Sequence, residues 1–336
     1  MTDFTALPDL ASRAVGGVVV AANDEFFADK ENLVTPAPPT FSPRTFTHRG
    51  QQYDGWETRR RREPGHDWAI VRLGAPGVIR GFVVDTAFFT GNYPESCSIE
   101  ATSVDGYPSP AELAGADWVE LVRRTGLTGD AQHPFAVASP RRCTHVRLSI
   151  YPDGGVARLR VHGEVVTDPR FLDGAPLDLA ALVNGAQIAA CSNAFYATPA
   201  NLISPGEALV MGDGWETARR RGGGNDWVVV RLAAAGRVRV AELDTTHFKG
   251  NAPGWAELRG AADPATVVDP SAWLPLLPRT RLQPNTRHRF LIPDAAPATH
   301  ARLDVYPDGG MARLRLFGVL TPEGRAAVER RWTETG

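Results

Sequence analysis

Short stretches of branched and aromatic residues, separated by glycine and proline, run along most of the chain. Residues 68–73 (WAIVRL) and 79–85 (IRGFVVD) are two such stretches, and residues 74–77 between them favour a turn. Residues 145–151 and 157–162 alternate apolar and polar positions with a period of two, as strands with one buried face do. The pattern predicts antiparallel strands, with 68–73 and 79–85 paired as a hairpin.

Helical patterns are few, and the clearest cover residues 9–15 and 322–332. Many short strands joined by glycine- and proline-containing turns are typical of a sandwich or jelly roll. The sequence therefore predicts an all-β fold built from antiparallel β-sandwiches.

The pattern of the first half of the chain recurs in the second half. The recurring blocks are Asp54–Arg60 with Asp213–Arg219, Asp85–Asn92 with Asp244–Asn251, and Tyr151–Arg160 with Tyr306–Arg315. The first two pairs lie 159 positions apart, and the third pair matches at nine of ten positions. Blocks that keep their order and register indicate an internal duplication.

The duplication predicts two domains of one fold. The first repeat covers residues 16–166 and the second covers residues 184–320. Residues 167–183 contain two prolines and are predicted to be an exposed linker. Residues 321–336 form a C-terminal tail. At 336 residues, each repeat is long enough to bury a core of its own.

Composition excludes several classes of protein. The 36 basic and 38 acidic residues give a net charge of −2, so nothing predicts nucleic-acid binding. No apolar run could span a membrane, and the N-terminus lacks the basic start of a signal peptide. We therefore expect a cytoplasmic protein without a membrane partner.

No residue pattern for a metal or a disulfide framework stands out. The three cysteines are odd in number and lack C-x-x-C spacing, and the eight histidines contain no H-x-x-x-H pair. We expect that no cofactor is required. The aspartates of the repeated loops still leave a divalent cation open as an alternative.

The repeated blocks resemble a known family. The order of an acidic glycine loop, a D-W-x-x-V-R-L strand and a closing strand pair resembles the galactose-binding-like, or discoidin-like, jelly roll. The tandem D-G-W-E-T-R-R, D-T-x-x-F-x-G-N and Y-P-D-G-G-x-A-R-L-R blocks resemble allantoicase, the allantoate amidinohydrolase family, over residues 16–320.

This resemblance implies a hydrolase that acts on a non-peptide C–N bond in a linear amidine. Its substrate would be allantoate, and its products ureidoglycolate and urea, in purine (allantoin) degradation. A small molecule is thus the expected partner, and we also expect a homo-oligomer.

The predicted hairpin would bring two loops of each repeat to one rim. In the first repeat these are Asp54–Arg60 and Phe88–Pro94, and in the second Asp213–Arg219 and Phe248–Pro253. An arginine fork suits the carboxylate of allantoate, and polar oxygens suit its ureido N–H groups. The substrate-binding candidates are Asp54, Trp56, Arg60, Asn92, Asp213, Trp215, Arg219 and Asn251.

Breaking the C–N bond requires a proton for departing urea and an activated water molecule. A carboxyl group or histidine whose pKa is moved towards neutrality could serve. The catalytic candidates are Glu57, Glu216 and His247, with Lys249 as a charge stabiliser. No motif for a covalent nucleophile is present, so direct acid-base hydrolysis is favoured.

Each candidate also has a structural alternative. The Asp-Gly pairs could be simple turns, the two Trp-Glu tryptophans could be packing residues, and Tyr-Pro-Asp-Gly-Gly favours a turn.

The two rims differ in sequence, since Phe88 and Thr90 of the first repeat correspond to His247 and Lys249 of the second. The extra histidine and lysine favour the second repeat slightly, but a composite pocket stays open. A non-catalytic tandem jelly roll that binds a carbohydrate or small ligand is the alternative function.

Overall fold

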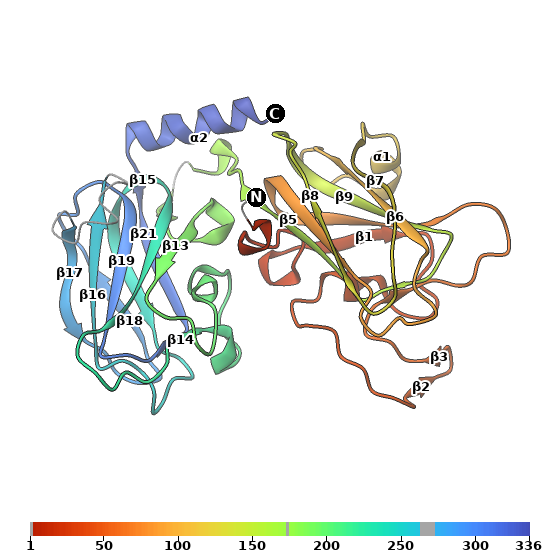
Figure 1. The fold of residues 1–336 in the computed structure, drawn as a ribbon. Helices are drawn as coiled ribbons and strands as arrows, with labels where there is room; N and C mark the ends of the chain where they lie inside the picture. The colour runs from red at the N-terminus through yellow and green to blue at the C-terminus, as the bar shows by residue number, and fades with distance from the viewer. Residues whose placement is uncertain (1–2, 173–174, 263–272) are drawn as a thin grey trace. The chain divides into compact units, whose positions relative to one another are not determined.

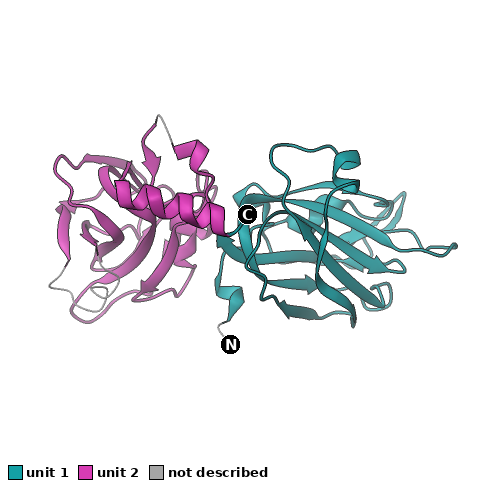
Figure 2. Cartoon of the chain, turned by 90° about the horizontal axis from the view of Figure 1, so that it is seen from above, with its two compact units in different colours: residues 1–166, 335–336 teal, residues 167–334 magenta. Residues whose placement is uncertain are grey.

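The protein folds into two compact units made almost entirely of β-strands (Figure 1). A computed structural model describes residues 3–172, 175–262 and 273–336. Unit 1 comprises residues 1–166 and 335–336, and unit 2 comprises residues 167–334 (Figure 2). The predicted fold class, two antiparallel β-sandwiches from a duplication, is confirmed.

Unit 1 is a sandwich of a five-stranded and a three-stranded layer. The five-stranded layer contains, in spatial order, β1 (Val18–Ala22), the first half of β5 (Asp67–Asp85), β9 (Arg142–Tyr151), β6 (Ser96–Thr102) and β7 (Val119–Gly126). The other layer contains β11 (Arg158–Val165), the second half of β5 and β8 (Gln132–Ala136). Two short ribbons pair β4 (Trp56–Glu57) with β10 (Gly155–Val156) and β2 (Phe46–Thr47) with β3 (Gly50–Gln51).

Unit 2 repeats this arrangement. One layer contains β13 (Gln187–Cys191), the first half of β15 (Asp226–Asp244), β19 (Ala298–Tyr306), β16 (Trp255–Ala261) and β17 (Leu274–Arg281). The other contains β12 (Leu177–Asp178), β21 (Arg313–Leu320), the second half of β15 and β18 (Arg287–Leu291). A ribbon pairs β14 (Trp215–Glu216) with β20 (Gly310–Met311).

In the residues that the structure describes, the helical structure consists of short elements and one longer helix. The α-helices are α1 (Pro110–Ala114) and α2 (Pro322–Glu334). The 3₁₀ turns are Phe4–Ala6, Arg13–Val15, Lys30–Val34, Pro169–Leu172, Leu182–Asn184, Pro199–Ile203 and Met211–Asp213. The helix predicted over 322–332 is confirmed, whereas the one predicted over 9–15 is wrong. Asp9 and Ser12 accept bonds from the amides two residues further on, and these local bonds turn the chain before a helix can extend.

The hairpin predicted between residues 68–73 and 79–85 is also wrong. These residues form one strand, β5, whose first half pairs with β9 and whose second half pairs with β11. The pairing register shifts between Arg72 and Gly77, where the strand bends and passes from one layer to the other. β15 does the same in unit 2.

The bent strand nevertheless returns both of its ends to one end of the sandwich. Asp67 lies opposite Ile150, and Asp85 lies opposite Arg158. Only a short turn separates Ile150 from Arg158, so the two ends of β5 meet at that turn. The expected rim therefore forms, although by a different route from a hairpin.

The boundaries between the repeats also differ from the prediction. Within the predicted linker, Leu177–Asp178 forms β12 against β21, and Leu179 is completely buried. Leu10 is equally buried in unit 1, which therefore includes residues before position 16. In the parts of the chain that the structure describes, no helix is long and apolar enough to cross a membrane.

Candidate functional site

Three segments of each unit meet at the rim. In unit 1, rim 1 consists of residues 54–60, 86–94 and 151–156. Thr58 and Gly154 exchange hydrogen bonds, with the Thr58 amide donating to the Gly154 carbonyl at 3.1 Å and the Gly154 amide donating to Thr58 Oγ1 at 3.1 Å. The amide of Gly155 donates to the carbonyl of Asn92 at 2.7 Å. The Tyr-Pro-Asp-Gly-Gly turn thus joins the rim, a placement that the sequence spacing left open.

Rim 2 is built from residues 213–219, 245–253 and 306–311 in the same way. Thr217 Oγ1 accepts from the Gly309 amide at 3.1 Å, and the Gly310 amide donates to the Asn251 carbonyl at 2.9 Å. Each unit therefore uses the repeated blocks for the same purpose, since their residues form the hydrogen bonds that join the three rim segments.

A glutamate and an asparagine form a hydrogen-bonded pair at each rim. Asn92 Nδ2 donates to Glu57 Oε1 at 2.7 Å, and Asn251 Nδ2 donates to Glu216 Oε1 at 2.6 Å. The loops predicted to share a rim are thus in direct contact. Asn251 also lies 3.2 Å from the Met211 sulfur, a contact without a counterpart at rim 1 among the bonds of the described residues.

Glu57 is the more buried of the two glutamates. Burial raises the pKa of its carboxyl group, and the hydrogen bond from Asn92 offsets part of this effect. Among the residues that the structure describes, no arginine or lysine forms an ion pair with Glu57. A carboxyl group in such a setting can hold a proton at a higher pH than an exposed glutamate can.

Asp54 and Asp213 hold their loops in place. Asp54 Oδ1 pairs with Nη2 of Arg158 at 2.8 Å, and the same guanidinium donates from Nη1 to the Asp54 carbonyl at 2.9 Å. In unit 2, Arg313 Nη1 donates to the Asp213 carbonyl at 2.6 Å, while the Asp213 carboxylate accepts from the Leu209 and Val210 amides.

Arg158 and Arg313 are rim residues that the sequence reasoning missed. Both guanidinium groups are buried at the start of the closing strand, where they join that strand to the Asp-Gly loop. Their signal was present, since both lie in the block that matches at nine of ten positions.

The two candidate tryptophans lie beneath the rims. Trp56 and Trp215 are completely buried, and their indole N–H groups donate to the carbonyls of Asp24 and Asn193 at 2.7 and 2.8 Å. This placement corresponds to the packing alternative, so we do not propose that either indole contacts substrate.

The arginine runs beside the Trp-Glu pairs divide into paired and free side chains. Arg59 pairs with Asp24 and Arg61 pairs with Asp67, each at 2.6 Å. Within the described ranges, exposed Arg60 and Arg219 form no hydrogen bond or ion pair. Arg60 lines a surface groove with its neighbours Asn23, Asp24, Arg59, Arg61, Arg62, Glu63 and Asp67. A free guanidinium in a groove is suited to binding an anion.

His247 and Lys249 distinguish rim 2. His247 Nε2 lies 2.9 Å from the Ala208 carbonyl, and because a carbonyl only accepts, Nε2 carries the proton. In the neutral ring, Nδ1 is then the atom able to accept a proton. Lys249 is exposed at the tip of the same loop.

A phenylalanine ring fixes the loop that carries the asparagine. A Cβ on Gly155 would lie 2.0 Å from the Phe89 ring, and one on Gly310 would lie 1.9 Å from the Phe248 ring. Each ring occupies the space that a side chain would need, which explains the glycine in the repeated turn.

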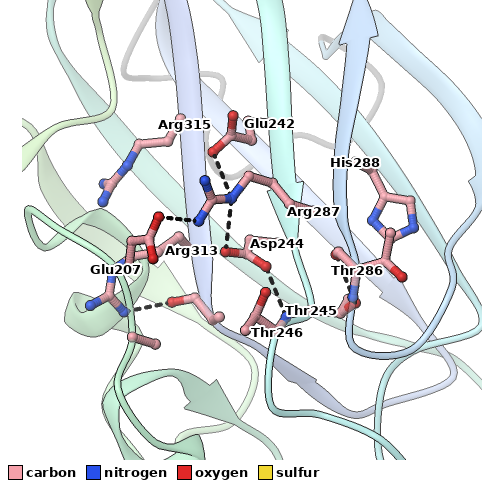
Figure 3. A network of polar contacts seen from close by, with 12 residues as sticks. Glu207, Glu242, Asp244, Thr245, Thr246, Thr286, Arg287, His288, Arg313 and Arg315 are labelled. Carbon is pink, nitrogen blue, oxygen red and sulfur yellow. Dashed lines mark hydrogen bonds and ion pairs between the residues drawn. The ribbon is translucent and has the colours of Figure 1, made fainter.

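An arginine network lies beside rim 2 (Figure 3), and a glutamine takes the place of its central arginine in unit 1. Arg287 pairs with Glu207 at 2.8 Å, Asp244 at 3.5 Å and Glu242 at 3.6 Å. Gln132 stands at the equivalent place in unit 1, where Nε2 donates to Asp85 at 3.0 Å. Ion pairs of an arginine therefore hold the end of β15 beneath rim 2, whereas the hydrogen bond of a glutamine holds the end of β5 beneath rim 1.

Comparison with known proteins agrees with this architecture. The family model described as the allantoicase repeat matches residues 8–166 and 177–321. The chain belongs to the allantoicase family. It is 58% identical to a probable allantoicase of Nocardia farcinica, over 94% of this chain and 95% of that protein. It is 52% identical to a probable allantoicase of Streptomyces coelicolor, over 99% of this chain and 91% of that protein.

A crystal structure of the Saccharomyces cerevisiae allantoicase superposes with a TM-score of 0.80 at 34% identity, covering 93% of this chain and 92% of that chain. The match to the allantoicase repeat begins at residues 8 and 177. In both units a completely buried leucine, Leu10 or Leu179, follows two residues later. Among the residues that the structure describes, no three histidine, cysteine, aspartate or glutamate side chains form a group able to hold a metal ion.

Proposed function

We propose that this chain is an allantoicase that hydrolyses allantoate to ureidoglycolate and urea in purine degradation, and that it works in the cytoplasm. Membership of the family supports the reaction. The observation that carries the assignment to a site is the buried Glu57–Asn92 pair, on a loop that also carries the unpaired Arg60 three residues after Glu57.

In this proposal, the substrate is held through its two kinds of polar group. The Arg60 guanidinium binds the allantoate carboxylate, and the Asn92 amide holds one oxygen of Glu57, so that the other oxygen faces the ureido nitrogen. Asp54 positions the loop through Arg158.

The reaction then needs one proton transfer in each direction. Protonated Glu57 donates its proton to the ureido nitrogen as the C–N bond breaks and urea leaves. A water oxygen bonds to the carbon atom from which the ureido nitrogen departs. The water gives a proton to the Glu57 carboxylate, which restores the acid. Water is consumed, and the products are ureidoglycolate and urea.

We assign this reaction to unit 1. The raised pKa of Glu57 supplies an acid that can remain protonated nearer to neutrality. Rim 2 is the alternative site, with Glu216 as acid or base, His247 as base, Lys249 as charge stabiliser, and Arg219 and Asn251 binding substrate.

Matched variants of the two glutamates test the assignment. Glu57→Gln should lower kcat for urea release by about 100-fold or more, since general acid-base catalysis contributes about 10² to 10⁴. Glu216→Gln, which makes the same change at rim 2, should leave kcat within about threefold of the wild type, a change worth under about 1 kcal/mol. The reverse order would move the reaction to unit 2, and near-normal activity of both variants would remove both glutamates from the mechanism.

Chelation tests the expectation that no metal is required. Urea release by the purified protein should be unchanged after exhaustive treatment with a chelator and removal of the complex. Activity that is lost and then restored by a divalent cation would assign the rim carboxylates to a metal instead. A protein that releases no urea from allantoate under either condition would contradict the proposed reaction itself.

A further inference from the structure

The five-stranded layer of unit 1 carries a groove on the face that points away from the core. The groove has a volume of about 540 Å³, within the range of about 300–1,000 Å³ that is usual for small-molecule sites. Trp68 of β5, Ser149 of β9 and Ser98 of β6 line it and lie directly opposite one another across the three strands. We call these three residues the outer row. Glu57 and Asn92 of rim 1 do not line the groove.

Unit 2 fills the equivalent row with its own side chains. Trp227, Asp304 and Glu257 lie opposite one another in the same register. The Tyr306 hydroxyl donates to Glu257 Oε2 at 2.9 Å, and Arg302 Nε donates to the two oxygens of Asp304 at 3.1 and 3.0 Å. The Arg302 guanidinium also lies over the Trp227 ring, 4.6 Å from its centroid. Each member of this row therefore has a partner within unit 2.

The arginine that covers the row in unit 2 is turned away from it in unit 1. Arg147 is the counterpart of Arg302. Its Nε donates to Glu100 at 2.8 Å, and its guanidinium lies over the ring of Trp118, 4.6 Å from the centroid. Within the described ranges, no ring or guanidinium stacks on Trp68. The face of this indole is thus left to the groove.

Serine replaces both carboxylates of the row and leaves hydrogen-bonding groups without partners. Ser149 is only 2% exposed, yet among the residues that the structure describes its hydroxyl forms no hydrogen bond, and neither does the indole N–H of Trp68. The Ser98 hydroxyl lies 3.0 Å from the Tyr151 hydroxyl, and each of these groups can form a further bond. Since buried polar groups are almost always hydrogen-bonded, an unpartnered hydroxyl at this depth in a groove indicates a ligand.

The charges in the wall of the groove are already neutralised by the chain. Arg61 pairs with Asp67 at 2.6 Å, and Arg147 pairs with Glu100 at 2.7 Å. The other carboxylate of the wall, Glu120, lies 3.8 Å from an arginine of the same strand. An ionic ligand would have to compete with these pairs, so the groove favours a neutral one.

The groups that remain define the chemistry of that ligand. The indole offers a flat apolar surface, and the serine hydroxyls can both donate and accept hydrogen bonds. A neutral ring with an apolar C–H face and hydroxyl groups at its edge, as in a sugar or a cyclitol, satisfies both. The row extends over three strands, about 10 Å, which accommodates one such ring.

We propose that the outer row of unit 1 is a binding site for a neutral polyhydroxylated ring, which packs on Trp68 and bonds to the hydroxyls of Ser149 and Ser98. The site is separate from the Glu57–Asn92 pair, so the proposal is independent of the proposed reaction.

Saturation-transfer NMR of the full chain tests this site. The probes are D-glucose, D-galactose, D-mannose and myo-inositol at millimolar concentration, with D-glucuronate as an acidic comparison. At least one neutral ring should receive saturation, and Trp68→Ala should weaken its binding about tenfold or more, as expected for a tryptophan at the centre of a contact. Trp227→Ala, which removes the corresponding indole of unit 2, is the matched control and should leave the binding unchanged.

A second variant tests the site without removing a large side chain. Ser149→Asp gives unit 1 the residue that unit 2 has, and the new carboxylate should pair with Arg147 as Asp304 pairs with Arg302. Binding of the neutral ring should be lost, while urea release and the melting temperature stay as in the wild type.

Three outcomes would overturn the proposal. They are the absence of saturation transfer to every neutral probe, stronger transfer to D-glucuronate than to the neutral rings, and binding that persists in both Trp68→Ala and Ser149→Asp. None of them depends on urea release, so a failure of this site is distinguishable from a failure of the proposed reaction.

Discussion

At the scale of single residues, the rim depends on which polar side chains already have partners. The sequence identified Glu57, Asn92 and Arg60 as candidates, and the structure brings the first two into contact and leaves the third unpaired. It could not show that Trp56 is buried, or that Asp54 is held by Arg158. Asp54 and Arg158 lie 104 positions apart, and Trp56 lies 32 positions from its hydrogen-bond partner Asp24, and residue type and spacing carry little information about such pairs.

The burial of Glu57 predicts a specific dependence of stability on pH. The pKa of Glu57 is raised from 4.5 in the folded protein, so the folded state holds more protons than the unfolded state between the unfolded and folded pKa values. Stability therefore falls as the pH rises through this window, and the loss persists above it. Glu57→Gln cannot ionise, so its free energy of unfolding should rise relative to the wild type between pH 4 and pH 7 in urea titrations.

Glu63→Gln is the control for this measurement, because Glu63 is exposed on the same loop. It should show no such pH-dependent gain. Equal pH profiles for the wild type and Glu57→Gln would mean that the Glu57 carboxyl is not destabilised by its surroundings.

At the scale of elements, the strands were predicted well and their pairing was not. Residues 68–73 and 79–85 are extended, as expected from their branched and aromatic residues, whereas the glycines between them favour a tight turn. They instead allow a bend within β5, because each half finds a separate neighbour, β9 or β11. A hairpin and a strand that bends between two layers share one local pattern, and only long-range packing distinguishes them.

The turn glycines provide a test of how the rim elements support the site. Gly155→Ala should displace the Phe89 ring and with it the loop that carries Asn92, lowering kcat/KM by about tenfold or more, which corresponds to about 1.4 kcal/mol. Gly310→Ala makes the same clash with Phe248 in unit 2 and should change kcat/KM much less. Steady-state urea release and thermal unfolding of both variants separate loss of activity from loss of fold.

Equal losses of activity in Gly155→Ala and Gly310→Ala, with equal melting temperatures, would contradict the assignment to unit 1. They would instead indicate that both rims contribute to turnover.

At the scale of the whole molecule, the duplication extends further than the sequence blocks first indicated. Asp9-Leu10-Ala11 recurs as Asp178-Leu179-Ala180, with the same displacement of 169 positions that relates Phe26 to Phe195. Both aspartates accept from a backbone amide of the closing strand, and both leucines are completely buried. The short match is visible in the sequence, but it lies inside residues 167–183, whose prolines predict an exposed linker.

This correspondence predicts that each unit depends on its first residues to a similar extent. Leu10→Ala and Leu179→Ala should each lower the free energy of unfolding by about 2–4 kcal/mol, the usual cost of a cavity at a fully buried leucine. Leu209→Ala, at an exposed position, should cost less than about 0.5 kcal/mol. Urea unfolding followed by tryptophan fluorescence would measure all three, and a Leu10→Ala variant as stable as Leu209→Ala would exclude residues 9–11 from the core.

The bent strand has a consequence for motion within each unit. Because β5 belongs to both layers, its bend near residues 74–77 is a covalent hinge between them, at the end of the sandwich away from Glu57. At the rim, the opposite end, the turn between Ile150 and Arg158 joins β9 of one layer to β11 of the other, so a second covalent connection lies there. Opening one layer against the other would strain the chain at both ends, and we therefore expect each sandwich to move as one body and the rim segments to keep their spacing.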